Sequence, residues 1–62
     1  MDKIMRLKEV LKVTGHGRST WYTLLKEGRV PRSVQLGDRN VGWFESEIQQ
    51  YIEDLRAKRD DE

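Results

Sequence analysis

The chain has 62 residues and a formal net charge of +1, and it is very polar, with 37% charged and 35% hydrophobic residues. This length allows one domain with a modest core, and the absence of cysteine excludes disulfides, thiolate zinc sites and cysteine nucleophiles. The sequence has neither the run of about 20 apolar residues that spans a membrane nor an apolar signal-peptide core. We therefore expect a cytoplasmic protein that does not bind membranes.

A short amphipathic helix is predicted near the N-terminus. Leu7, Val10 and Leu11 follow the i, i+3, i+4 spacing of one helical face, which predicts a helix over about residues 6–13. Gly15 follows at the position where a left-handed residue commonly ends a helix.

A second helix is predicted over about residues 18–27, after a tight turn. Gly17 or Arg18 stands at its N-cap position, where glycine is acceptable although it adds no side-chain acceptor. Gly28 is expected to end the helix, and Pro31 prevents it from resuming.

A small β-hairpin is predicted over about residues 33–43. Val34 and Leu36 alternate with polar residues, as do Val41 and Trp43 with polar or small ones. The turn-forming residues 37–40 lie between these two runs and make a four-residue tip.

A third helix is predicted from about residue 45. Its apolar face consists of residues at i, i+3, i+4 and i+7, namely Ile48, Tyr51, Ile52 and Leu55. Ser46 and Gln49 have the spacing of a capping box at the start of this helix.

Together these elements predict a mainly α fold with a small β-hairpin wing, which is a winged helix-turn-helix. We expect this domain to cover residues 1–56. Residues 57–62 form a charged C-terminal tail with one apolar residue, and we expect this tail to fray.

The second helix separates into an apolar and a polar face when residues advance by about 100° each. Trp21, Leu24 and Leu25 fall together and are expected to point inward. The outward face is predicted to carry a guanidinium, hydroxyls, a phenol and an amine, from Arg18, Ser19, Tyr22, Thr23 and Lys26. Such groups donate to phosphates and reach base edges in a major groove, although any solvated helix face carries similar residues.

Basic residues outside this helix extend the candidate surface. Arg39, at the tip of the predicted hairpin, is positioned to enter a minor groove or contact phosphate, or else is a solvated turn residue beside Asp38. Arg29 and Arg32 flank the connection to the hairpin, and either contact phosphate or keep the loop soluble. Lys8 and Lys12 are further candidates for phosphate contacts. Residues 1–44 carry a net charge of +5 and residues 45–62 a net charge of −4, which indicates a polyanion-facing body with an acidic end.

Other functional classes find little support. Trp21, Trp43, Phe44 and Tyr51 have the spacing of core residues rather than of a platform for stacking single-stranded bases. His16 is expected to be a partly packed turn residue, because no second histidine is present to form a metal site or a catalytic pair with it. We predict no catalytic residues, no metal, no cofactor and no enzymatic activity.

Several segments also have an order and a spacing that are typical of one family. They are Arg6-Leu7-Lys8-Glu9-Val10, Thr14-Gly15, Gly17-Arg18-Ser19-Thr20-Trp21-Tyr22, Lys26-Glu27-Gly28-Arg29-Val30-Pro31, Leu36-Gly37-Asp38-Arg39 and Trp43-Phe44-Glu45-Ser46-Glu47-Ile48. Over about residues 4–55 the chain resembles the AlpA family of prophage transcriptional regulators. The resemblance implies a winged helix like that of excisionases and of the DNA-binding domain of MerR-type regulators. It also implies that Arg18, Ser19, Tyr22 and Lys26 match the recognition helix, and Arg39 the wing arginine.

Three positions depart from the pattern of the AlpA family. Thr23 and Gly42 stand where the family often has arginine, and His16 stands where it usually has an apolar residue. The first two changes are expected to remove positive charge from the DNA-binding surface. If each arginine made one phosphate contact, its loss would make the salt dependence of binding shallower by about 0.9 in logarithmic slope.

The sequence therefore predicts a sequence-specific, double-stranded DNA-binding transcriptional regulator of a prophage or other mobile element. The helix at about 18–27 would enter the major groove, and the wing at about 33–43 would contact the adjacent minor groove or backbone. An integrase, RNA polymerase or further copies of the chain bound cooperatively on DNA are candidate partners, and no small-molecule ligand is expected. One alternative is an excisionase-type architectural factor that bends DNA for an integrase. Another is a small protein-binding adaptor that has lost DNA binding, which the changes at Thr23 and Gly42 would favour.

Overall fold

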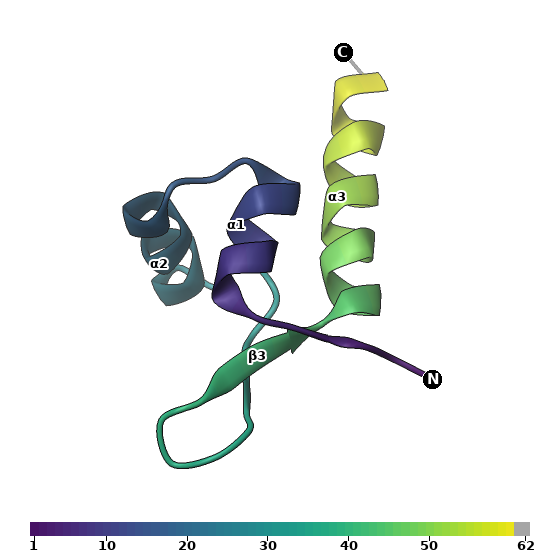
Figure 1. Cartoon of the computed structure of the whole chain (residues 1–62). Coiled ribbons are helices and arrows are strands. Elements are labelled where there is room, and N and C mark those ends of the chain that lie inside the picture. The colour runs from purple at the N-terminus through teal and green to yellow at the C-terminus, as the bar shows by residue number, and fades with distance from the viewer. Residues whose placement is uncertain (61–62) are drawn as a thin grey trace.

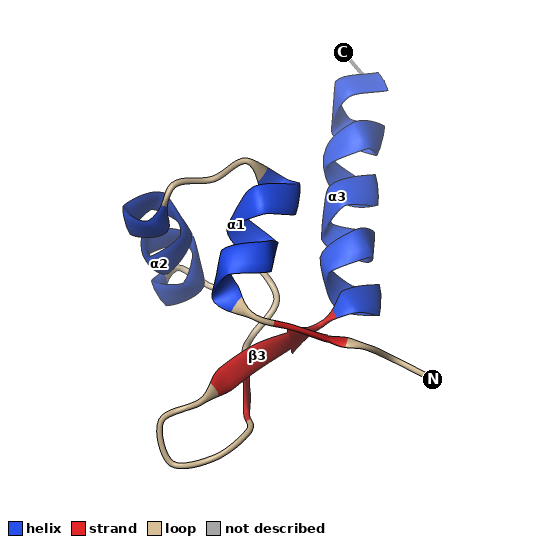
Figure 2. Ribbon diagram, in the orientation of Figure 1, coloured by secondary structure: helices blue, strands red, loops and turns tan. Residues whose placement is uncertain are grey.

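The computed structural model describes residues 1–60 and shows three helices with a small antiparallel sheet (Figure 1, Figure 2). In chain order the elements are β1 (Ile4–Met5), α1 (Leu7–Thr14), α2 (Arg18–Lys26), β2 (Val34–Gln35), β3 (Val41–Phe44) and α3 (Glu45–Asp60). This arrangement is the predicted winged helix-turn-helix, with the loop between β2 and β3 as the wing. The first two helices begin and end within one residue of the predicted bounds.

Glycine shapes the turn between α1 and α2. Gly15 adopts the left-handed conformation, with φ of 78°, and its N–H donates to the Leu11 carbonyl at 2.9 Å. Gly17 is extended, and its carbonyl accepts the Trp21 N–H at 2.9 Å, which makes it the N-cap of α2. The turn is therefore three residues long, and a backbone hydrogen bond closes the end of α1 that faces it.

A Schellman motif ends α2. Gly28 has a φ of 72°, its N–H donates to the Leu25 carbonyl at 3.1 Å, and the Arg29 N–H donates to the Leu24 carbonyl at 2.9 Å. This pair of bonds satisfies carbonyls that the helix itself leaves free. The chain therefore leaves α2 abruptly, with Arg29 as the last residue of the motif.

The sheet has one strand that the sequence analysis did not predict. The strand order is β1-β3-β2, and β1 pairs antiparallel with β3 in the register Ile4↔Phe44 and Met5↔Trp43. A two-residue strand is too short for alternation to be recognised, which explains why it was missed. Because of β1, the N-terminal segment lies across the base of α3 (Figure 1).

The start of α3 is capped from a distance rather than by the predicted capping box. The helix begins at Glu45, as predicted, but Ser46 lies inside it and donates through both its N–H and its hydroxyl to the Asp2 carboxylate, at 3.1 and 2.6 Å. The Glu45 N–H donates to the Lys3 carbonyl at 2.7 Å. Residues 2 and 3 therefore satisfy the first two of the four N–H groups that a helix start leaves free.

We expect the Asp2 cap to make stability depend on acid pH. The Ser46 hydroxyl, followed by the Ser46 N–H, lowers the pKa of the Asp2 carboxyl below its ordinary value. A depressed carboxyl pKa contributes stability that is present above the unfolded-state pKa and is lost as the pH falls through the folded-state pKa. Thermal unfolding of wild type and Asp2→Asn should therefore differ at pH 7, with the variant less stable, and converge below about pH 4. Melting temperatures that differ equally at pH 7 and at pH 3 would contradict the cap.

α3 extends beyond the end of the predicted domain. The ordered domain was expected to finish at residue 56, whereas the helix continues through Lys58 and Arg59 to Asp60. Two basic residues in the last turn complement the partial negative charge of a helix C-terminus. Arg56 also pairs with Glu53 at 3.5 Å across one helical turn. Residues 61–62 of the predicted tail lie outside the described residues.

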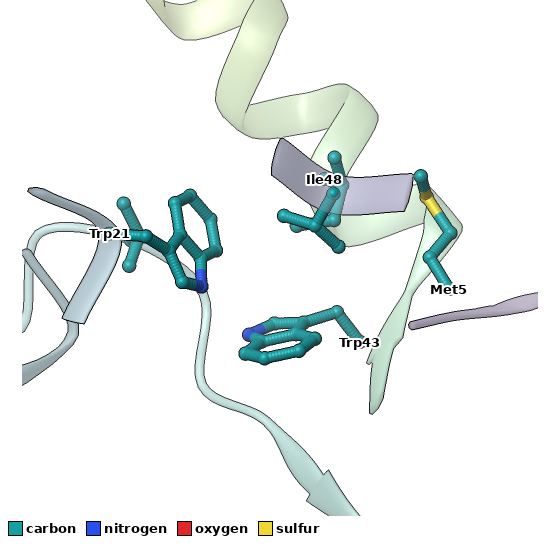
Figure 3. Packing of buried hydrophobic residues seen from close by; sticks show 6 residues of the cluster. Met5, Trp21, Trp43 and Ile48 are labelled. Atoms are coloured by element: carbon teal, nitrogen blue, oxygen red, sulfur yellow. The ribbon is translucent and has the colours of Figure 1, made fainter. Parts of the chain in front are cut away.

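The core forms where α1, α2, α3 and β3 meet. Six side chains are buried there, namely Met5, Val10, Trp21, Val30, Trp43 and Ile48. Trp21 and Trp43 pack edge to face, with ring centroids 5.9 Å apart (Figure 3). The Trp43 indole donates to the Pro31 carbonyl at 3.1 Å, so the core also fixes the connection between α2 and the wing.

The indole N–H of Trp21 is buried without a conventional hydrogen-bond acceptor among the described residues. Figure 3 shows this nitrogen on the side of the Trp21 ring that faces Trp43. The Trp21 and Trp43 rings meet at an interplanar angle of 72°. The two predicted core tryptophans are therefore confirmed, whereas Phe44 and Tyr51 are only partly buried.

Candidate nucleic-acid interface

α2 presents a polar face to solvent opposite its buried side. Trp21 is fully buried, and Leu24 and Leu25 are partly buried against the core. The side chains predicted to face outward are all exposed, namely Arg18, Ser19, Tyr22, Thr23 and Lys26. The sequence-based division of this helix into two faces is confirmed.

The exposed face of α2 carries unneutralised positive charge. In the part of the chain that the structure describes, no carboxylate lies within ion-pair distance of Arg18 or Lys26. Tyr22 is 50% exposed, which leaves its ring and hydroxyl accessible. The Thr23 hydroxyl is engaged within the helix, where it donates to the Ser19 carbonyl at 3.0 Å. The face therefore offers cationic donors at both ends of the helix.

The two arginines after α2 differ in their surroundings. Arg29 lies 3.7 Å from Glu27, and both side chains are at least half exposed, so the pair partly offsets the positive charge there. Arg32 is exposed in the loop that leads to β2, and among residues 1–60 no acidic side chain pairs with it. Arg32 is thus the more available cation of the two.

The wing tip holds Arg39 on a braced loop. The Leu36 N–H donates to the Asn40 carbonyl at 2.7 Å, and the Gln35 side-chain amide donates to carbonyls inside the tip. The Arg6 guanidinium donates to the Asn40 side chain at 3.2 Å and ties the tip to the N-terminal segment. Arg39 is exposed, and no ion pair joins it to Asp38 or another described carboxylate.

Sequence reasoning missed the two residues that brace the wing, Arg6 and Gln35. Arg6 was assigned to the first turn of a helix, but it is extended and bonds to a residue 34 positions away. No local pattern marks a contact of that separation. Gln35 acts over two and three residues, which is close enough for its position beside a turn to have suggested it.

α2 and the wing lie away from the acidic helix α3, whereas Arg29 lines a groove together with Glu47 and Asp54 of that helix. In Figure 1, α2 forms the left edge and the β2–β3 loop projects at the lower left, while α3 rises on the right. α3 carries Glu45, Glu47, Glu53 and Asp54 in its first three turns. The separation of charge along the sequence is therefore also a separation in space, which favours one polyanion-facing side.

His16 links the helix-turn-helix to α3. Its Nε2 lies 2.9 Å from the Tyr51 hydroxyl, and its ring packs against Trp21 with centroids 5.9 Å apart. This confirms a partly packed turn residue. Burial raises the pKa of the Tyr51 phenol, against the opposing effect of the Arg29 charge. The contact fixes the turn before α2 relative to the rest of the core.

An open groove of about 350 Å³ lies between α3 and the loop that follows α2. Glu47, Gln50 and Asp54 line one side, and Arg29 and Pro31 line the other, with Tyr51 between. Its acidic side distinguishes it from the basic surface of α2. Within residues 1–60, no group of three or more histidine, aspartate or glutamate side chains is placed to hold a metal ion.

Gly42 corrects one expectation from the sequence. Glycine here, in place of the arginine common in the family, is expected from the sequence to remove positive charge from the DNA-binding surface. In the structure Gly42 is buried in β3 between its neighbouring strands. A Cβ at this position would lie 2.5 Å from the Ile4 Cγ2 and 3.1 Å from the Met5 carbonyl oxygen. The close approach of β1 therefore favours glycine here, and a side chain at position 42 would start among Ile4, Met5 and Leu36 rather than in open solvent.

Comparison with known protein families shows to which family the chain belongs. The family model described as "Prophage CP4-57 regulatory protein (AlpA)" matches residues 3–57, which is nearly the whole chain. The chain belongs to the AlpA family. The predicted resemblance is thus confirmed, together with the winged helix-turn-helix expected of the family.

Two curated relatives support membership of the AlpA family. The chain is 34% identical over 56 residues to "DNA-binding transcriptional activator AlpA" of Escherichia coli strain K12, an alignment that covers 81% of this chain and 80% of that protein. It is 40% identical over 47 residues to "Uncharacterized protein ORF88" of Enterobacteria phage P4, covering 76% of this chain. The chain spans about half of that phage protein, 53% of its length. No solved structure matches the chain.

Among the described residues, no helix combines the length and the apolar character that crossing a bilayer needs. The longest described helix, α3, contains eight charged residues.

Proposed function

We propose that this AlpA-family protein is a sequence-specific, double-stranded DNA-binding transcriptional regulator of a prophage or other mobile element. The observation that carries the proposal is the exposed face of α2, whose cations pair with no carboxylate among residues 1–60 and which lies opposite the buried Trp21. This face follows a three-residue glycine turn, as the recognition helix of a helix-turn-helix does. Membership of a family of prophage regulatory proteins supports the same reading.

In the proposed complex, α2 lies in the major groove. Arg18 and Lys26 donate to base edges or phosphates at the two ends of the helix, and Ser19 and Tyr22 supply hydroxyls between them. Because the nine residues of α2 present about two turns, they read only a few base pairs.

In the same complex, the wing follows the adjacent backbone or minor groove. Arg39 contacts it from the loop tip that Arg6 and Gln35 hold in place. Arg29 and Arg32, together with Lys8 and Lys12, contribute phosphate contacts. These contacts position the protein without specifying sequence.

Useful specificity then requires more than one copy on DNA or a DNA-bound partner. Single small modules bind short sites, and dimeric or tandem arrangements extend the sequence that is read. Cooperative binding of further copies, or contact with an integrase or RNA polymerase, would supply this extension. No small-molecule effector takes part in the proposed mechanism.

Two alternatives make different predictions. An excisionase-type factor would bind at an attachment site and bend it, rather than act at a promoter. A protein-binding adaptor would use the groove beside α3, whose acidic side, formed by Glu47 and Asp54, suits a basic partner segment. Both alternatives preserve the fold.

The proposal is tested by fluorescence anisotropy with labelled duplexes from the upstream region of the gene, from any neighbouring attachment site and from unrelated DNA. Saturable binding that prefers one duplex and weakens as salt rises is expected. Preference for the upstream duplex supports a regulator, and preference for the attachment site with bending in a permuted-fragment assay supports an excisionase. Folded protein that binds no duplex at low salt would overturn DNA binding and favour the adaptor.

Single substitutions test the proposed surface. We expect Lys26→Ala and Arg39→Ala each to weaken duplex binding about tenfold at low salt, because each removes a hydrogen bond from a charged group. Each should also make the slope of log affinity against log salt shallower by about 0.9. Lys58→Ala removes an equal charge from the last turn of α3 and should leave affinity nearly unchanged. If all three variants bind as wild type does, the assignment of the surface is wrong.

A further inference from the structure

Thr23 lies in the middle of the exposed face of α2, and its hydroxyl proton is already used in a hydrogen bond within the helix. The Oγ1–H donates to the Ser19 carbonyl at 3.0 Å, one turn earlier in the same helix. A threonine hydroxyl has one proton, so this bond leaves only oxygen lone pairs and the methyl group available on the exposed side chain. Thr23 therefore differs from its neighbours Ser19 and Lys26, whose donors have no partner in the described part of the chain.

This geometry limits what Thr23 recognises in a DNA groove. Phosphate oxygens, guanine N7 and O6, and thymine O4 are all hydrogen-bond acceptors. A side chain whose proton is already donated cannot form a hydrogen bond with any of them. The apolar feature that the major groove offers is the C5-methyl of thymine, which the threonine methyl group suits. The remaining lone pairs suit the adenine amino group of the same base pair.

We propose that Thr23 is a specificity-determining residue that reads the methyl group of one thymine in the major groove. This inference rests on the proposed function, since it requires α2 to lie in that groove. The helix would then combine two kinds of readout. Arg18 and Lys26 supply donors for acceptor-rich edges, and Thr23 supplies an apolar contact between them. At position 23, where the AlpA family often has arginine, this chain would therefore have an apolar contact to a thymine methyl group in place of a cation.

The test replaces single thymines by deoxyuridine, which removes only the C5-methyl group. It uses the duplex that wild type prefers in the binding experiment, with one replacement per duplex. Wild type should lose about three- to fivefold in affinity at one thymine, the loss expected for one buried methyl group, and should tolerate replacement elsewhere. Indifference to every replacement by a wild-type protein that binds specifically would overturn the inference.

Two variants assign the methyl contact to Thr23. Thr23→Ser keeps the hydroxyl and removes the methyl group, so it should bind the thymine and deoxyuridine duplexes equally. Thr23→Val keeps a methyl group and removes the hydroxyl, so it should retain the preference for thymine. If the hydroxyl instead contacted phosphate, Thr23→Val would weaken binding to every duplex and Thr23→Ser would keep the preference for thymine. Either of those results would overturn the inference.

Thr14→Ser provides a matched control. Thr14 makes the same kind of bond, from its hydroxyl to the Val10 carbonyl at 2.7 Å, but it lies at the end of α1. This variant should keep the wild-type preference for thymine. The two proposals fail in different ways: absence of any specific duplex binding removes the proposed function, whereas specific binding without methyl dependence removes only the role of Thr23.

Discussion

Trp43→Ala is expected to lower strongly the urea concentration at which the protein unfolds. Trp43 is 1% exposed in the central strand, packs against Trp21, and donates to the Pro31 carbonyl. Truncating a buried tryptophan costs about 3–5 kcal/mol. A domain of this size has a free energy of unfolding of about 3–9 kcal/mol, so the substitution removes a large share of it. Urea denaturation followed by far-ultraviolet circular dichroism measures the loss without relying on the tryptophan signal.

Two companion variants separate the contributions of Trp43. Trp43→Phe keeps an aromatic ring in β3 and removes the indole N–H, so its loss should fall well below that of alanine. Tyr22→Ala truncates an aromatic side chain that is 50% exposed on α2, and its unfolding free energy should stay within about 0.5 kcal/mol of wild type. A Trp43→Ala protein that unfolds at the wild-type urea concentration would remove Trp43 from the core.

Local sequence patterns were sufficient for the helices and for the face that α2 exposes. Apolar periodicity located α1, α2 and α3, and Gly15 and Gly28 marked the two left-handed helix ends. These features depend on residues within one or two helical turns, which is the range over which periodicity and capping act. The exposure of Lys26 and the burial of Trp21 followed from the same 100° rotation per residue.

The contacts that join distant segments were not predictable from such patterns. Asp2 caps α3 across 44 residues, and Arg6 reaches Asn40 across 34. β1 is too short to show alternation, and without β1 the burial of Gly42 has no visible cause. The orientation of the Thr23 hydroxyl is also hidden, because threonine on a helix surface adopts more than one rotamer. These features depend on how distant segments pack in three dimensions or on the rotamer that a side chain adopts. They determine the shape of the wing and which groups the candidate site exposes.

A side chain at position 42 is expected to destabilise the protein, even where it restores the residue that is common in the AlpA family. A Cβ would lie 2.5 Å from the Ile4 Cγ2, a contact that requires the Ile4 side chain or β1 to shift, and 3.1 Å from both the Leu36 Cδ1 and the Met5 carbonyl oxygen. Overpacking of this kind lowers the free energy of unfolding by about 1–3 kcal/mol. Replacing glycine also reduces the conformational freedom of the unfolded chain, which raises the free energy of unfolding by about 0.4–1 kcal/mol. Gly42→Ala should therefore lose about 1–2 kcal/mol in urea denaturation. Gly42→Arg should lose at least as much.

The source of this loss is tested by changing the opposing strand. Ile4→Ala removes the nearest methyl group, so the double variant with Gly42→Ala should be more stable than the sum of the two single losses predicts. Strict additivity, or a Gly42→Ala protein as stable as wild type, would show that β1 does not approach β3 this closely. Gly42→Arg should also fail to raise DNA affinity per folded molecule, because its side chain starts from a buried position. A stable Gly42→Arg protein with tighter binding and a steeper salt dependence would instead place position 42 on the DNA-facing surface.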